Sequence, residues 1–371
     1  MNDFKLGFGF MRLPIINGDV SQIDYNKVNT LVDYYIENGG RYFDTGFNYH
    51  NGKSEEAIKK CVIDRYSRDE VLIADKMPIY GMTINDNPEN IFQTQLERCG
   101  LDYFDYYLVH NTSDLFYNGV CKQLNVFDYL REFKKEGLIN KLGISHHGTP
   151  EALNQVLTEN QDIEFVQLQI NYVDWKNDAV QAKKCYEIVK DNGLDVFVME
   201  PLKGGNLVNV PEKVEKLFQS YNQKSPVNWA LSYVLNLSSV ALVLSGMSDL
   251  KELQENMSIV KDFKTMNNDE LEIIKQARDI INDSIEIPCT YCDYCFKYCP
   301  KQIPISKYFS IFNDEKQSKV DQMLNYLYYD NYAEKFTKAS SCVKCGACEK
   351  VCPQQIKISE ELEKVVNLFE K

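Results

Sequence analysis

The sequence predicts an α/β protein in two parts, a (β/α)8 barrel and a smaller, cysteine-rich α+β domain that follows it. The chain has 371 residues, which suits a barrel of ~250 residues with an additional module. Within the first 265 residues, strand-like runs alternate with helical patterns eight times. Beyond position 288, eight of the 12 cysteines form two blocks of identical spacing. The alternation predicts the barrel, and the cysteine blocks predict a separate domain.

The barrel prediction rests on short runs rich in β-branched and aromatic residues, each followed by a helical pattern. In chain order, strands are expected at 7–10, 42–45, 71–75, 104–109, 141–145, 165–169, 196–199 and 240–244. The helices that follow them are expected at 23–38, from 54 onward, and at 89–98, 126–136, 150–157, 179–192, 227–236 and 249–259. Eight units close a barrel, whereas an open doubly wound sheet usually has a Gly-x-Gly-x-x-Gly turn after its first strand. That turn is absent from this sequence.

Three segments are expected along the chain. The barrel takes residues 1–265. A linker takes residues 266–285 and has apolar residues at Leu271, Ile274 and Ile281, which predicts a helix. The cysteine-rich domain takes residues 286–371.

The composition argues against several classes of function. Acidic residues number 54 against 41 basic ones, and the formal net charge of −13 at pH 7 disfavours nucleic acid as a partner. No apolar run approaches the ~20 residues that span a bilayer, so no membrane association is expected. The N-terminus lacks a basic region followed by a long apolar stretch, so no signal peptide is evident. We therefore expect a soluble, cytoplasmic protein.

Two cysteine motifs provide the strongest signal in the sequence. They read Cys289-x2-Cys292-x2-Cys295-x3-Cys299-Pro300 and Cys342-x2-Cys345-x2-Cys348-x3-Cys352-Pro353. Each cysteine of the second motif lies 53 positions after its counterpart in the first, so the motifs form an internal repeat. Three cysteines within seven residues form a short loop that can present three thiolates to an iron–sulfur cube.

The spacing resembles that of bacterial two-cluster ferredoxins, with a longer insert (301–341) between the motifs. The resemblance implies a ferredoxin-like dicluster domain with two [4Fe–4S] clusters, in which each fourth cysteine binds the cluster of the other motif. One cluster would be held by Cys289, Cys292, Cys295 and Cys352, and the other by Cys342, Cys345, Cys348 and Cys299. Zinc is an alternative, although tetrahedral zinc usually takes two separated Cys-x2-Cys pairs. The clusters imply electron transfer, and a purely structural role is a second alternative.

Four polar residues stand at or just after the ends of three neighbouring strands. Asp44 ends the second expected strand, and Tyr49 follows it by five residues. Lys76 ends the third strand and His110 the fourth. Each residue alone is more often a helix cap, a solvated side chain or a satisfied core residue. Because the chemistry of such barrels lies at the C-terminal ends of the strands, the four together predict a catalytic site.

These four residues resemble, in order and approximate spacing, the catalytic Asp, Tyr, Lys and His of the aldo-keto reductase family, whose fold is a TIM barrel. Further similar stretches are 7–14, 49–55, 143–146, 201–205, 245–248 and 255–256, so the resemblance covers about residues 1–260. It implies an oxidoreductase that reduces a carbonyl or related small-molecule substrate with NAD(P)H. It places the nucleotide against Ser145, His146, Gln167, Pro201, Leu202, Lys203, Gly204, Gly205, Ser245, Gly246, Met247, Ser248, Glu255 and Asn256.

The chemistry of the four residues can also be argued directly. A free tyrosine has a pKa of ~10 and is a poor acid near neutral pH. A buried Lys76 ammonium beside Tyr49 is expected to lower the pKa of the tyrosine, which would then donate a proton to the carbonyl oxygen. Asp44 would keep Lys76 charged and oriented, and His110 would donate a hydrogen bond to the same oxygen.

The identity of the barrel cofactor stays open at this point. The family often has a basic residue just after the glycine of strand eight to hold the 2′-phosphate of NADP, but this chain has Met247, Ser248 and Asp249. NADH and flavin are therefore alternatives to NADPH. A nicotinamide moves two electrons and each cluster moves one, and a flavin is the usual converter between them.

Three hypotheses follow. The first is an NAD(P)H-dependent oxidoreductase whose clusters link the barrel to a redox partner such as a ferredoxin. The second is a ferredoxin-dependent reductase with a flavin in the barrel. The third is an electron-carrier subunit whose barrel docks partners, and the intact group of Asp44, Tyr49, Lys76 and His110 argues against it.

Overall fold

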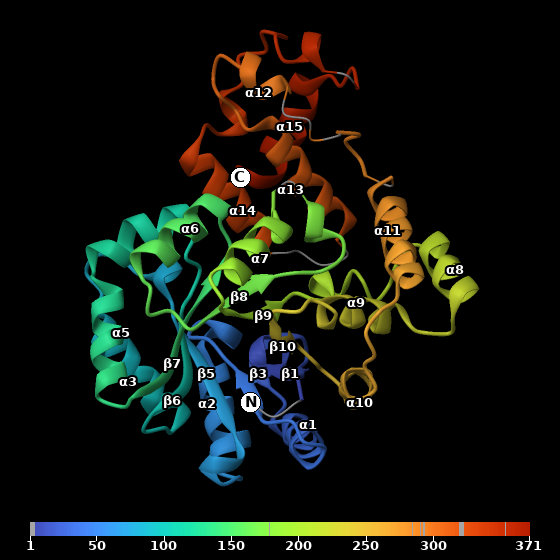
Figure 1. Ribbon diagram of the computed structural model, residues 1–371. Helices are drawn as coiled ribbons and strands as arrows, with labels where there is room; N and C mark the ends of the chain where they lie inside the picture. Colours follow the sequence, from blue (N-terminus) through green and yellow to red (C-terminus); the bar gives the residue numbers. More distant parts are fainter. Residues whose placement is uncertain are drawn as a thin grey trace.

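The first part of the chain is a closed barrel. A computed structural model describes residues 4–177, 179–283, 285–289, 291, 294–318, 323–352 and 354–371. Eight parallel strands follow one another around the barrel in the order β1-β10-β9-β8-β7-β6-β5-β4, which confirms the predicted (β/α)8 fold (Figure 1). The strands are β1 (Leu6–Gly9), β4 (Tyr42–Asp44), β5 (Leu72–Met77), β6 (Phe104–Val109), β7 (Ile139–His146), β8 (Phe165–Gln169), β9 (Asp195–Met199) and β10 (Val240–Ser245).

Several outer helices begin at residues that cap the free N–H groups of the first turn. Asp24 accepts a hydrogen bond from the backbone of Lys27 at the start of α1. Asn87, Thr149 and Ser225 cap α3, α6 and α9, each followed by a proline in the first helical turn. The barrel helices are α1 (Tyr25–Glu37), α2 (Ser54–Ile58), α3 (Pro88–Cys99), α5 (Val126–Lys135), α6 (Pro150–Glu159), α7 (Ala182–Asp191), α9 (Pro226–Leu235) and α10 (Leu250–Lys261).

The barrel part also contains elements that we did not expect from the sequence. The strands β2 (Ile15–Ile16) and β3 (Asp19–Ile23) form a hairpin. Its turn residues Asn17 and Gly18 both have positive φ, which is the Asn-Gly hairpin signal. Two helices were also unexpected, α4 (Asp114–Phe116) after β6 and α8 (Glu212–Tyr221) after β9.

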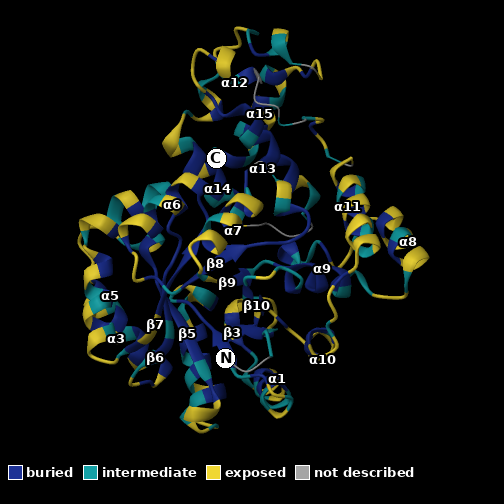
Figure 2. Cartoon of the chain, in the orientation of Figure 1, coloured by how far each residue is buried: buried dark blue, intermediate teal, exposed yellow. Residues whose placement is uncertain are grey.

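Two hydrophobic clusters pack against the barrel strands, one inside the barrel and one outside it. A small cluster inside the barrel contains Tyr42, Ala74, Leu108, Phe165, Phe197, Leu242 and Leu244. A much larger cluster lies between the strands and the surrounding helices and continues into the second part of the chain. Figure 2 shows the strands as mostly buried, with the exposed residues on the outer faces of the helices. The packing on both sides of the strands therefore fixes the positions of the strand ends.

The second part of the chain lies next to α6 and α7 (Figure 1), and it contacts the barrel at loops that follow β6, β7 and β8. Its described residues form helices and short 3-10 turns and include no strand. The helices are α11 (Asn268–Asn282), α12 (Tyr294–Tyr298), α13 (Ile305–Gln317), α14 (Met323–Lys335) and α15 (Ile358–Phe369). No helix in the described ranges combines the length and apolar character that a membrane span requires.

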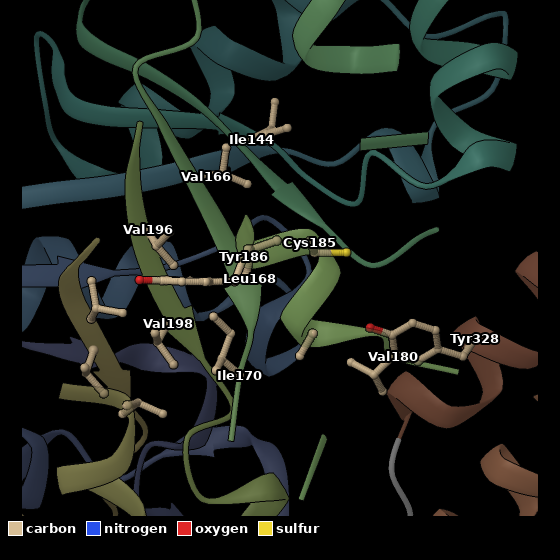
Figure 3. Packing of buried hydrophobic residues seen from close by; sticks show 14 of the residues in the cluster. Ile144, Val166, Leu168, Ile170, Val180, Cys185, Tyr186, Val196, Val198 and Tyr328 are labelled. Carbon is tan, nitrogen blue, oxygen red and sulfur yellow. The ribbon is translucent and has the colours of Figure 1, made fainter. Parts of the chain in front are cut away.

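Helices α13 and α14 join the two parts. The Tyr332 hydroxyl of α14 donates a hydrogen bond to the Ala179 carbonyl at 3.0 Å. Figure 3 shows Tyr328 of α14 next to Val180 within the buried cluster. On α13, Asp314 accepts a hydrogen bond from the Asn177 side chain at 2.9 Å. These contacts fix the insert between the cysteine motifs against the loops that follow β8.

Candidate active site

The four residues expected to form a catalytic group meet at the C-terminal ends of three strands. Asp44 ends β4, Lys76 lies near the end of β5, and His110 directly follows β6. The Lys76 ammonium donates hydrogen bonds to Asp44 Oδ1 at 2.6 Å and to the Thr45 carbonyl at 2.5 Å. It lies 5.0 Å from the centre of the Tyr49 ring, and the rings of Tyr49 and His110 are 6.0 Å apart. The structure therefore brings all four side chains together.

Burial controls the protonation of this group. Burial alone would lower the pKa of Lys76, but the Asp44 carboxylate raises it above its ordinary value, so the ammonium keeps its charge. Burial raises the pKa of Tyr49 to about 12, and the Lys76 ammonium opposes this rise. We expected Lys76 to bring the pKa of Tyr49 down. Its charge does act in that direction, but the loss of water around the phenol outweighs it.

The two histidines near Tyr49 are neutral. Burial, with a smaller contribution from the charge of Lys76, holds the pKa of His110 well below its ordinary value. Burial lowers the pKa of His147 to about 3. Among the described residues, the Nδ1 atoms of both rings and the side-chain amide of Asn111 have no hydrogen-bond partner. Buried polar groups are normally hydrogen-bonded, so these three side chains are available to a bound molecule.

A cavity of about 450 Å³ opens over this group. The predicted residues that line it are Asp44, Tyr49, His110, Gln167, Gly204, Ser245 and Gly246. The sequence analysis did not include its other polar lining residues, which are Arg12, Tyr80, Asn111, His147 and Glu200. Asn111 and His147 directly follow predicted site residues, so their position after a strand was a signal that could have identified them.

A second cavity of about 390 Å³ shares part of its wall with the first. Arg12, Glu200, Gly204, Ser245 and Gly246 belong to both linings. The second lining also contains predicted nucleotide contacts, namely Pro201, Leu202, Gly205, Ser248, Glu255 and Asn256. Together the two cavities extend from Tyr49 to the loops after β9 and β10.

The loop after β9 is suited to the close approach of a ligand. Gly204 and Gly205 have φ angles of +64° and +95°, which L-residues with a side chain rarely adopt. A Cβ built on Gly205 would have no atom within 4 Å, so this stretch faces open space. The second cavity, called the nucleotide groove from here on, has a size and lining that fit an elongated nucleotide. Loops after strands seven and eight commonly hold phosphates in such barrels.

Four of the predicted nucleotide contacts lie outside both linings. The ring nitrogens of His146 lie 2.8 Å from the Thr112 carbonyl and 3.0 Å from the Thr149 carbonyl, so its side chain supports the loop. The Ser145 hydroxyl accepts a hydrogen bond from the Asn111 backbone at 3.1 Å. Met247 is fully buried.

Lys203, the fourth of these residues, binds the insert between the cysteine motifs. Its ammonium forms ion pairs with Asp174 and with Asp314 of α13, and all three side chains are buried. Burial raises the pKa of Asp314 to about 6, and the nearby Lys203 opposes the rise. The glycine-rich loop after β9 is therefore joined directly to the second part of the chain.

The acidic side chains of the groove bear on the choice of nucleotide. Glu252 accepts hydrogen bonds from the backbone and hydroxyl of Ser248, at 2.7 and 3.0 Å. Glu255 accepts one from the Ser225 hydroxyl at 2.6 Å. Arg12 is the basic residue of the lining and is paired with Glu200 at 3.2 Å. The groove around Ser248 is thus acidic.

The cysteine repeat is also a repeat of backbone geometry. The Tyr291 amide points to Cys289 Sγ and the Lys344 amide to Cys342 Sγ, each at 3.4 Å. Tyr291 and Lys344 have positive φ and lie 53 positions apart, which equals the spacing of the cysteines. Helices α13 and α15, which begin at Ile305 and Ile358, have the same offset. Backbone amides directed at sulfur are suited to thiolates that carry charge.

The structure describes most, but not all, of the cysteines predicted to bind the clusters. Cys299, Cys342, Cys345 and Cys348 all line one small cavity, which fits the set expected for one cluster. Of the other set, Cys292 lies outside the described residues. Among the described residues, no three His, Cys, Asp or Glu side chains are close enough to hold a single metal ion.

A parallel barrel with a buried polar group at the C-terminal ends of its strands is typical of a barrel enzyme. The family model "Aldo/keto reductase family" matches residues 5–279. Because this is well over half of the chain, the protein belongs to the aldo/keto reductase family. A second model, "4Fe-4S dicluster domain", matches residues 288–357, so an iron–sulfur domain is fused C-terminally.

Relatives of known name match the barrel part. An aldo-keto reductase of Mycobacterium avium is 23% identical over 72% of this chain and 87% of its own length. Methylglyoxal reductase DkgA of Yersinia pestis is 26% identical over 71% of this chain and 88% of its own length. Both matches cover about the length of the reductase domain.

Solved structures show the same fold. The aldo-keto reductase of Klebsiella pneumoniae in complex with NADPH matches with a TM-score of 0.58 and 16% identity, over 73% of this chain and 90% of that chain. The holo form of AKR11C1 from Bacillus halodurans matches with a TM-score of 0.57 and 23% identity, over 74% and 91%. These likenesses support the barrel architecture.

Proposed function

We propose that the barrel reduces a small-molecule carbonyl by hydride transfer from a nicotinamide nucleotide, and that two [4Fe–4S] clusters exchange single electrons with a soluble redox partner without taking part in the hydride step. The observation that carries the proposal is the buried Asp44–Lys76 ion pair beside Tyr49. Asp44 and Tyr49 line the cavity of about 450 Å³, which we take as the substrate cavity. A charged pair that is costly to bury, placed beside a phenol at a cavity, is typical of a catalytic site.

Each residue has a role in that reaction. A bound nicotinamide would supply hydride to the carbonyl carbon. Tyr49 donates its proton to the carbonyl oxygen, and the Lys76 ammonium stabilises the phenolate that remains. Neutral His110 donates a hydrogen bond to the same oxygen. Asp44 holds Lys76 in place and compensates its charge.

The relatives support this assignment of substrate and cofactor classes. One is named a methylglyoxal reductase, which is a carbonyl reductase by name, and another binds NADPH in its structure. In this chain the nucleotide would lie along the groove lined by Gly204, Gly205, Gly246 and Ser248, with its reactive end beside Gln167. Carbonyl reduction by NAD(P)H is the function that these observations support best.

We further propose that NADH is preferred over NADPH. Glu252 lies at the groove beside Ser248, where the charge of a 2′-phosphate would be repelled, whereas a carboxylate can accept hydrogen bonds from ribose hydroxyls. Replacing Glu252 by glutamine should lower the ratio of the Kd for NADPH to the Kd for NADH by about five-fold, which is the scale of one charge interaction of ~1 kcal/mol in water.

Fluorescence titration of both nucleotides against the Glu252→Gln variant measures this ratio. The exposed Glu212 of α8, replaced in the same way, serves as the matched control and should leave the ratio unchanged. The proposed preference would be contradicted if the wild-type protein bound NADPH more tightly than NADH and the Glu252→Gln variant had the same ratio of the two Kd values.

The pKa shifts at the site predict a flat pH profile. A raised pKa keeps Tyr49 protonated, and therefore able to donate its proton, up to about pH 11. The lowered pKa values of His110 and His147 keep both rings neutral near and above neutral pH. We expect kcat/KM for carbonyl reduction to change less than about two-fold between pH 6 and pH 9. A steady-state profile in one mixed buffer checks this, and a break near pH 7 would assign the proton donor to a group other than Tyr49.

A flavin in the barrel is the second candidate, because one-electron clusters need a converter to exchange electrons with a hydride donor. Anaerobic purification with iron, acid-labile sulfide and flavin assays, followed by NADH oxidation with a panel of carbonyls, separates the candidates. About eight irons per chain, no flavin and saturable nucleotide binding support the proposal. Eight irons with one flavin per chain support the ferredoxin-dependent reductase. Zinc in place of iron would exclude the electron relay.

A further inference from the structure

Helix α14 reaches the substrate cavity from the other part of the chain. It lies in the insert between the two cysteine motifs, yet Met323, Leu324 and Leu327 line the same cavity as Tyr49 and His110. These residues occupy neighbouring positions on the first turns of the helix, so they form one apolar face. Met323 is 66% exposed, so among the described residues no group covers this large apolar side chain at the cavity edge.

The helix is held in this position by contacts to three different loops of the barrel. Asn331 donates a hydrogen bond to the His147 carbonyl at 3.2 Å, and Tyr332 donates one to the Ala179 carbonyl at 3.0 Å. Lys335 pairs with Asp114, which follows β6, at 2.8 Å. The apolar face of α14 is thus fixed relative to the site on a rigid element.

The two sides of the cavity differ in chemistry. Tyr49, His110, Asn111 and His147 lie at the strand ends and provide the polar atoms that can orient a carbonyl oxygen. The face of α14 has no polar side chain, so it can bind only the hydrocarbon part of a ligand. A molecule that fills the cavity from Tyr49 to α14 therefore has a polar end and an apolar body.

We propose that α14 forms the specificity wall of the active site and selects carbonyl substrates with an apolar chain or ring of several carbons. Leu324 and Leu327 are the residues that determine how large this body can be. The proposal deepens the carbonyl reductase function and rests on it for the reaction, but the binding preference can be measured without turnover.

The test compares Leu327→Ala with wild-type holoprotein on two aldehydes, propanal and hexanal. Truncation removes contacts only from the longer chain, so kcat/KM for hexanal should fall about ten-fold while that for propanal changes less than about two-fold. Leu368→Ala is the matched control, since this half-buried leucine lies on α15 of the same domain and does not line the cavity. Iron content and melting temperature confirm that each variant is folded and loaded.

A measurement of binding without turnover tests the specificity wall independently of the proposed reaction. Acetamide and hexanamide are unreactive carbonyl analogues, and calorimetry on the nucleotide-bound protein measures their Kd. Selective weakening of hexanamide by Leu327→Ala supports the wall. Equal weakening of both amides, or of neither, would overturn it. If the wild type reduces no aldehyde but binds hexanamide through Leu327, the proposed reaction fails and the wall stands.

Discussion

Replacement of Tyr49 by phenylalanine is expected to lower kcat for carbonyl reduction by about 10²–10⁴-fold, the usual contribution of a positioned proton donor. The substitution removes one hydroxyl and keeps the ring that lies over the Lys76 ammonium. The Asp44–Lys76 ion pair therefore stays intact, and no charge is left unpaired. The nucleotide groove lies beyond Gly204 and Gly246, so the affinity for NADH should change less than about two-fold.

Stopped-flow turnover at saturating substrate and fluorescence titration of the nucleotide measure the two effects separately. Tyr106→Phe is the matched control, because Tyr106 packs against Tyr42 and Phe165 inside the barrel and does not line the substrate cavity. If Tyr49→Phe retains the activity of the control, another group donates the proton. If the affinity for the nucleotide collapses instead, Tyr49 acts in binding.

The second large effect concerns the clusters. If each fourth cysteine binds the cluster of the other motif, Cys299→Ala and Cys345→Ala remove ligands from the same cluster, and the double variant should retain about four of about eight irons per chain. Cys299→Ala combined with Cys289→Ala removes ligands from both clusters and should leave almost no iron. The physical reason lies in one small cavity, which Cys299, Cys342, Cys345 and Cys348 line together.

Iron and acid-labile sulfide assays on anaerobically prepared protein give these numbers directly. Cys185→Ala serves as the control, since Cys185 is buried on α7 in the barrel part. The opposite result, with four irons in the Cys299/Cys289 variant and almost none in the Cys299/Cys345 variant, would assign each motif its own cluster. Full iron in both double variants would exclude these cysteines as ligands.

The barrel could be predicted from the sequence because short, local patterns indicate each of its strands and helices. Short runs of apolar residues followed by helical patterns recur eight times, and each strand lies near its expected position. The meeting of Asp44, Lys76 and His110 was also predictable, because they stand at strand ends that a closed barrel must bring together. The pKa of Tyr49 was not, since it depends on how completely the fold removes water from the phenol.

Contacts between distant segments set the limit of what could be predicted. Lys203 lies in a glycine-rich loop typical of a phosphate site, yet its ammonium pairs with Asp174 and Asp314, which is 111 positions further along the chain. His146 follows Ser145 at a strand end, but its ring is held by the carbonyls of Thr112 and Thr149. No local pattern in 323–327 indicates that this segment reaches the site. These features follow from packing between elements that the sequence places far apart.

The place of α14 between the two cysteine motifs gives the barrel a dependence on metal supply. A chain made under iron starvation keeps its eight strands and its Asp44–Lys76 pair, because both belong to the barrel. The domain that positions Met323, Leu324 and Leu327 would have no clusters to organise it, and small domains built around a metal centre commonly depend on that centre to fold. Substrate selection would then follow the iron status of the cell even if no electron ever passed through a cluster. The C-terminal domain would therefore couple the substrate selectivity of the barrel to the supply of iron.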